Sequence, residues 1–224
     1  MITTNIKLYT FDELSEDAQK VVIERQRDDI GYTSAQSYAE DWEASLKKFE
    51  ELIGITVRYN VEYDGSGSDY SFDFNEAVYY NSECTIWDDE VKGRLLARFL
   101  DKIYYDIRSR KYIHSGMRKN VVYCDGKKTK HSNIMWEENN CPLTGCIYDC
   151  PLLEPIYEWQ KKWDMDISLH DLIDKCLDKF FTGWESDMEH CYDDEFVAEI
   201  ISVNSNGDLY YENGTLYEGP KIAV

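Results

Sequence analysis

The residues with the most distinctive chemistry in this chain are four cysteines. Cys141, Cys146 and Cys150 lie within ten residues, and Cys124 and His131 precede them. Thiolates and an imidazole could hold Zn²⁺ tetrahedrally and staple a loop region that lacks its own core. The spacings are irregular, whereas strong zinc sites carry cysteine pairs two residues apart, and free cysteines also pack as small apolar side chains. We expect no cofactor, and structural zinc stays the alternative.

Motifs of nucleotide and hydrolytic chemistry are absent from the sequence. It contains no P-loop, no dinucleotide glycine fingerprint, no Gly-x-Ser-x-Gly turn and no metalloprotease spacing of histidines. The segment from Asp64 is rich in oxygen ligands, as calcium loops are. Its sixth position is Asp69 instead of Gly and its twelfth is Asn75 instead of Glu, so we interpret it as a polar turn.

Carboxylates are the most abundant reactive groups. The chain has 44 Asp and Glu against 24 Lys and Arg, a formal net charge of −20 in 224 residues. Pairs such as Asp164 and Asp166 could hold Mg²⁺, but such pairs arise by chance among so many acids. We therefore expect a protein that is not an enzyme, with a metal-dependent hydrolase as the alternative. The charge also argues against binding to duplex DNA or to an anionic membrane.

The acids gather in clusters on predicted helices, mostly at positions that the apolar residues leave to solvent. Carboxylates three to four residues apart on a helix recur every ~5–6 Å, which is close to the spacing of phosphates along one DNA strand. Several such helices could present a DNA-like field to a basic groove, and exposed aromatic side chains could anchor the contact. The candidate partner-binding residues are Glu40, Asp41, Glu43, Asp88, Asp89, Glu90, Asp193, Asp194, Glu195, Tyr70 and Tyr79.

The cellular compartment is expected to be the cytoplasm. No apolar stretch approaches the ~18 residues of a membrane-spanning helix, and the first residues lack a basic segment followed by a long apolar run. Seven cysteines are an odd number, which favours reduced thiols. The composition thus argues against a secreted protein, a membrane-spanning protein and a basic nucleic-acid-binding protein.

The elements that must position these groups are mostly helices. Apolar periodicity predicts helices over 15–30, 34–53, 88–107, 152–163, 168–191 and 193–203, with Ser15 and Asp88 as N-caps. Alternation predicts a hairpin of 55–63 with 69–74, and strands over 119–123 and 131–137. Asn206-Gly207 and Asn213-Gly214 indicate C-terminal hairpin turns. The fold class is α+β, helix-dominated, with a central antiparallel hairpin and a C-terminal hairpin. We expect a single compact domain over 1–224, with a loop-rich insertion at 112–151.

The opening of the chain carries a short pattern formed by Tyr9, Phe11 and Glu13-Leu14-Ser15. It resembles the start of a diffuse group of acidic proteins encoded by phages and prophages, which begin with tyrosine-x-phenylalanine-x-glutamate-leucine-serine. The end of the chain, from Asp194 to Tyr217, is similar to the terminal helix and hairpin of that group. The resemblance implies a mobile genetic element, where small acidic proteins often counter host defences or antitoxin-like partners.

These observations lead to one expected function and two alternatives. The first is an inhibitor from a phage or mobile element that binds and occludes a basic, nucleic-acid-handling host defence complex, such as a CRISPR effector or a restriction enzyme, by DNA mimicry. The alternatives are a metal-dependent hydrolase and an antitoxin-like regulatory protein that binds one host protein through an apolar face, with acidity serving only solubility. The expected partner carries a basic nucleic-acid-binding surface, and no direct binding to DNA or membrane is expected.

Overall fold

The computed structural model describes residues 6–80, 85–109, 143–204 and 208–219. Contacts divide the chain into two compact units. Unit 1 takes in 1–38, 62–67 and 185–224, and unit 2 takes in 39–61 and 68–184. The single-domain assignment stays a prediction, and each unit is described by itself. The predicted strands at 119–123 and 131–137 lie outside the described residues.

The first long element is a single helix, α1, over Glu16–Ile53. The prediction of two helices is therefore wrong, because nothing between 30 and 34 breaks the backbone. Gly31 lowers helix propensity by about 1 kcal/mol relative to alanine but does not end a helix, and the ring of Tyr192 packs where its Cβ would be. Ser15 accepts the amide of Ala18 at 3.4 Å, as predicted for an N-cap. Gly54, at φ +83°, follows the last turn.

The predicted hairpin is confirmed in unit 2. Strands β1 (Ile55–Val61) and β2 (Ser68–Phe74) pair antiparallel, with a register that runs from Ile55 opposite Phe74 to Val61 opposite Ser68. A second, short pair joins β3 (Tyr79–Tyr80) to β4 (Thr85–Ile86). Because side chains alternate along a strand, Ile55 and Val57 are buried while Thr56 and Arg58 are exposed.

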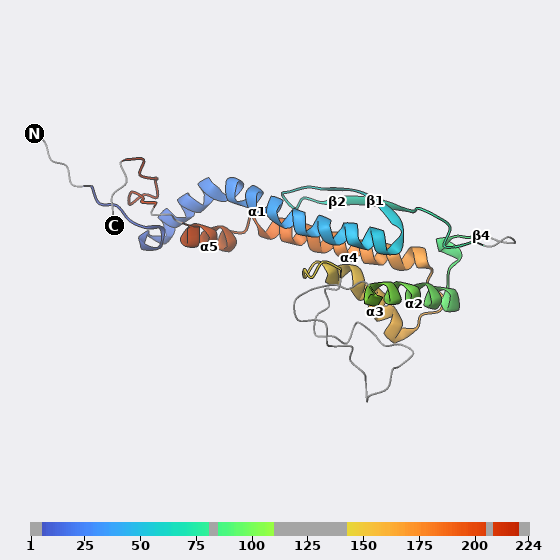
Figure 1. The fold of residues 1–224 in the computed structure, drawn as a ribbon. Helices are drawn as coiled ribbons and strands as arrows, with labels where there is room; N and C mark the ends of the chain where they lie inside the picture. The colour runs from blue at the N-terminus through green and yellow to red at the C-terminus, as the bar shows by residue number, and fades with distance from the viewer. Residues whose placement is uncertain (1–5, 81–84, 110–142, 205–207, 220–224) are drawn as a thin grey trace, which may run out of the picture. The chain divides into compact units, whose positions relative to one another are not determined.

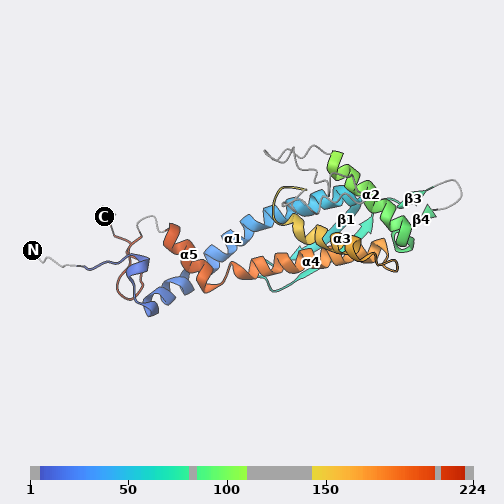
Figure 2. The same cartoon turned by 90° about the horizontal axis from the view of Figure 1, so that it is seen from below.

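Three further helices build unit 2. They are α2 (Gly93–Ser109), α3 (Asp149–Lys162) and the first part of α4 (Leu169–His190). The prediction that Asp88 caps α2 is wrong, because Asp88 lies in a separate 3₁₀ turn, η2 (Asp88–Glu90). Within this unit, the hairpin covers one face of the α1–α4 pair, and α2 and α3 lie on the other face (Figures 1 and 2).

An aromatic cluster around Trp42 holds the helices of unit 2 together. The Trp42 ring centroid lies 4.8 Å from that of Phe180 and 6.1 Å from that of Trp184 on α4, and 4.4 Å from that of Tyr148, which precedes α3. Gly183 permits this approach, since a Cβ there would come within 2.9 Å of the indole. Aromatic pairs at such distances add about 0.5–1.5 kcal/mol each beyond area burial.

Unit 1 is organised around Tyr210. Its backbone amide and carbonyl pair with those of Tyr9 at 2.8 and 2.9 Å, and the chain then turns at Gly214 so that Leu216 bridges back to Tyr210. Helix α5 (Asp194–Asn204) and the 3₁₀ turn η1 (Phe11–Glu13) complete the unit (Figure 1). The buried core contains Phe11, Leu14, Ala18, Val22, Ile23, Val197, Ile201 and Tyr210. The predicted fold class, α+β and helix-dominated, is confirmed. In the part of the chain that the structure describes, no helix is both long and apolar enough to cross a membrane.

A buried carboxylate fixes the start of α3 to α1. Asp149 is fully buried. It accepts the backbone amides of Leu143 and Thr144 at 2.8 Å each and the hydroxyl of Ser45 at 2.9 Å. Hydrogen bonds to an ionised group contribute about 1.5–3 kcal/mol, and they compensate here for the cost of removing the charge from water.

We expect Asp149→Asn to lower the free energy of unfolding by about 2–4 kcal/mol, because an amide cannot accept from all these donors and leaves some of them unpaired. Urea unfolding followed by circular dichroism measures the change. Asp89→Asn, at an exposed carboxylate of the same unit, is the matched control and should shift stability by less than about 0.5 kcal/mol. An equal, small effect of both variants would contradict the structural role of Asp149.

Candidate binding surface and pocket

The negative charge is unevenly distributed between the two units. Unit 1 has 19 Asp and Glu against five Lys and Arg, a net charge of −14, although it is the smaller of the two. Unit 2 has 25 acids against 19 bases, a net charge of −6. Unit 1 therefore carries 14 of the 20 surplus negative charges on little more than a third of the chain. It is the more strongly attractive surface for a cationic partner.

Exposed carboxylates of unit 1 are arranged along its helices. Asp17, Glu24 and Asp28 on α1 are exposed, and their spacings of seven and four residues place them on one helical face. On α5, Glu195 and Glu199 are exposed and lie one turn apart. These positions carry the acids at separations of about 6 to 10 Å along each helix.

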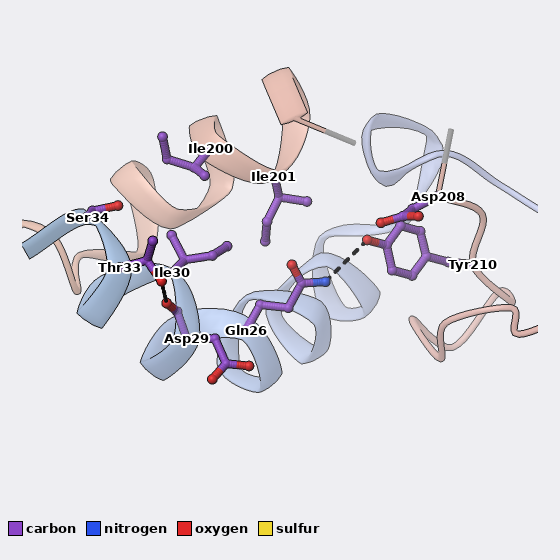
Figure 3. Close-up of a pocket in the computed structure, with 9 residues that line it drawn as sticks. All are labelled: Gln26, Asp29, Ile30, Thr33, Ser34, Ile200, Ile201, Asp208 and Tyr210. Atoms are coloured by element: carbon purple, nitrogen blue, oxygen red, sulfur yellow. Dashed lines mark hydrogen bonds between the residues drawn. The ribbon is translucent and has the colours of Figure 1, made fainter. Parts of the chain in front are cut away.

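A pocket of about 430 Å³ opens on unit 1 (Figure 3). One wall is α1, which contributes residues at spacings of three, four, seven and eight, and the other wall is α5 with the segment leading to Tyr210. Figure 3 shows Asp29 and Asp208 on either side of Gln26. The pocket is lined by Gln26, Asp29, Ile30, Thr33, Ser34, Ile200, Ile201, Asp208 and Tyr210.

Tyr210 closes one end of this pocket and is held there by a hydrogen bond. Its hydroxyl lies 3.4 Å from Gln26 Nε2, which donates to it. Burial raises the pKa of Tyr210, with the Asp208 carboxylate adding to the rise and the Gln26 hydrogen bond opposing it. The phenol therefore stays protonated and neutral at physiological pH, so the negative charge of the pocket lining comes from Asp29 and Asp208.

The pocket residues do not stand out as a group in the sequence. The polar positions Gln26, Asp29 and Thr33 share one face of α1, which the sequence pattern does reveal. That α5 and Asp208 lie opposite them depends on the pairing of Tyr210 with Tyr9, near opposite ends of the chain. No local sequence pattern predicts that contact.

The first predicted cluster, Glu40, Asp41 and Glu43, lies in unit 2 on α1, and all three residues are exposed. Asp41 also faces a thiol. The pKa of Cys146 is raised, first by burial and then by the Asp41 carboxylate. All three carboxylates therefore lie on the surface, and the charge of Asp41 contributes to the raised pKa of the Cys146 thiol.

The second predicted cluster, Asp88, Asp89 and Glu90, forms the 3₁₀ turn η2 of unit 2. Asp89 and Glu90 are exposed, whereas Asp88 is half-buried. Asp88 Oδ2 lies 2.6 Å from His170 Nδ1, and the imidazole stacks on the Phe72 ring with centroids 4.7 Å apart. Asp88 therefore joins η2 to α4, and its charge is partly engaged within the protein.

The third predicted cluster, Asp193, Asp194 and Glu195, lies in unit 1 at the start of α5 and is exposed. Asp194 pairs with Arg27 of α1, and Asp193 Oδ2 lies 2.9 Å from His190 Nδ1. The structure brings this cluster into the same unit as the pocket. The other two clusters belong to unit 2.

The two predicted aromatic anchors are differently placed. Tyr70 on β2 is half-buried, its ring stacks on Phe181 at 4.9 Å, and its hydroxyl donates to Asp174 of α4. This tyrosine attaches the hairpin to α4. Tyr79 lies in β3, and its side chain is outside the described residues. Among the described aromatic residues, Tyr32 and Trp87 are the more exposed, at 53% and 51%.

The cysteine candidates are only partly described. Cys124, Cys141 and His131 lie outside the described residues, and Cys146 and Cys150 are half-buried. Burial also raises the pKa of Cys191 to about 11. Within the described ranges, no group of three or more His, Cys, Asp or Glu side chains is arranged to hold a metal ion.

No protein-family model, no curated protein and no solved structure matches this chain.

The raised pKa of Cys146 predicts slow alkylation near neutral pH, because the thiolate is the nucleophile. We expect Asp41→Asn to lower this pKa and to accelerate alkylation of Cys146 about two- to threefold at pH 8, a modest gain because burial is the larger cause. Site-resolved mass spectrometry after timed exposure to iodoacetamide measures the rate. Glu43→Gln is the control and should leave it unchanged, and identical rates in all three proteins would contradict the placement of Asp41.

Proposed function

We propose that this protein is a non-enzymatic inhibitor that binds a basic, nucleic-acid-handling partner and occludes it through the acidic surface of unit 1. The observation that carries the proposal is the concentration of 14 surplus negative charges in this smaller unit. Solubility alone needs a net charge of only about 2–8 for a small domain. The excess is local, and it lies where exposed acids and a pocket occur together.

The physical basis is electrostatic attraction that acts before contact. A surface with this density of carboxylates attracts a positive groove over a Debye length of about 8 Å at physiological ionic strength. It accelerates association with the correct partner and repels other polyanions. DNA that approaches the same groove would be repelled by this protein, which carries the same negative charge and occupies the groove. Carboxylates such as Glu24, Asp28, Glu195 and Glu199, all exposed, would take the places of phosphates.

The class of partner follows from the resemblance of the opening segment to phage- and prophage-encoded acidic proteins. In a mobile element, a protein that occupies a basic nucleic-acid channel would protect the element from a CRISPR effector or a restriction enzyme. We propose such a host defence complex as the partner, with action inside the host cell. The clusters at Asp193–Glu195, Glu40–Glu43 and Asp88–Glu90 are the proposed contacts beyond the pocket.

The proposal is tested by capture from a nuclease-treated host lysate at ~0.1 M salt. We expect the tagged protein to retain a partner that binds nucleic acid, and to release it when duplex DNA is added or when salt is raised to ~0.5 M, because charge contacts weaken with screening. Mass spectrometry identifies the released protein, and a gel-shift assay with purified partner checks that it binds DNA.

A different pattern would support the rival in which an apolar face makes the contact. In that case the partner would stay bound at ~0.5 M salt and in excess DNA, and it would be lost when Tyr32 or Trp87, the two most exposed of the described aromatic residues, is changed to Ala. That outcome would mean that the acidic residues serve only solubility, and it would contradict the proposal.

A further inference from the structure

The unit 1 pocket combines an apolar floor with carboxylates and contains no basic residue in its lining. We infer that it receives an arginine- or lysine-bearing segment of the partner. This inference rests on the proposed function and names the contact that gives the acidic surface its specificity. The juxtaposition that carries it is Ile30, Ile200 and Ile201 together with Asp29 and Asp208 in one lining.

The floor suits the stem of a basic side chain. Ile30 and Ile200 are half-buried, and Ile201 and Tyr210 are buried. Lysine and arginine bury their methylene stems along such apolar surfaces and keep the charged head near water or a carboxylate. An acidic surface without this floor would attract cations but would not distinguish a long basic side chain from a simple ion.

The two carboxylates of the pocket are available to a ligand. Among the described residues, no Lys, Arg or His pairs with Asp29 or Asp208. By contrast, Asp194 is already paired with Arg27, and Asp193 with His190. A guanidinium or ammonium entering the pocket would therefore gain a charge-assisted hydrogen bond without breaking an existing ion pair.

The charge of unit 1 and the volume of the pocket both restrict which ligand can bind in the pocket. An anionic ligand, or a second copy of this chain, would meet the repulsion of 14 surplus negative charges. The volume of about 430 Å³ lies within the range of ~300–1,000 Å³ that is typical of ligand sites. A short basic segment of the partner satisfies both restrictions.

The test uses the full-length protein and a fluorescent hexa-arginine peptide, with anisotropy measured at ~0.15 M salt. We expect Asp29→Asn with Asp208→Asn to weaken binding more than about tenfold. The matched control, Glu16→Gln with Glu218→Gln, removes the same charge from exposed sites of the same unit and should weaken it only about twofold. Thr33→Trp, at an exposed lining position, should also weaken binding, because it fills the pocket without changing its charge.

Three outcomes would overturn the inference, and they separate it from the proposed function. Equal weakening by both double variants, with no effect of Thr33→Trp, would leave the acidic surface intact and reject the pocket. If free spermidine bound in the pocket as tightly as the hexa-arginine peptide, the pocket would be a polyamine site instead of a protein contact. Failure of the wild-type protein to bind the peptide even at ~0.05 M salt would reject the inference and the proposed function together.

Discussion

Electrostatic repulsion within unit 1 is the constraint on which the rest of this structure depends. The unit holds 19 carboxylates and only five Lys and Arg, and like charges at such density destabilise a compact state. The opposing forces are burial of a small apolar core and the paired backbones of Tyr9 and Tyr210. The surface of unit 1 thus carries a charge distribution that works against folding.

Unit 2 meets a weaker version of this constraint and is built differently. Its 25 acids are largely offset by 19 bases, and its core is a cluster of large aromatic side chains centred on Trp42. The structural carboxylate of unit 2, Asp149, is buried and accepts hydrogen bonds from several surrounding donors. Asp29 and Asp208 have no such set of donors among the described residues, and this contrast separates the proposed binding carboxylates from the structural one.

Local physics made much of the fold predictable from the sequence. The apolar spacing that ends with Leu46, Phe49 and Ile53 and the alternation in 55–63 each report a buried face, so the helices and the hairpin followed directly. The division of α1 into two helices failed because the modest propensity cost of Gly31 is outweighed by packing on both sides of it. The pocket could not be predicted, since its walls meet through the bridge between Tyr9 and Tyr210. The uneven charge was present in the sequence but became visible only when contacts defined the units.

The central claim is that local charge density, and not net charge, drives binding. The most direct test measures association rates of the purified partner with two variants of equal net charge, −16. One carries Glu24→Gln, Asp28→Asn, Glu195→Gln and Glu199→Gln in unit 1, and the other carries Glu76→Gln, Asp101→Asn, Asp166→Asn and Asp178→Asn, at exposed acids of unit 2 outside the proposed contacts. We expect the unit 1 variant to associate more than about tenfold more slowly than the wild-type protein. The unit 2 variant should associate less than about threefold more slowly than the wild-type protein. Equal rates for the two variants would contradict it.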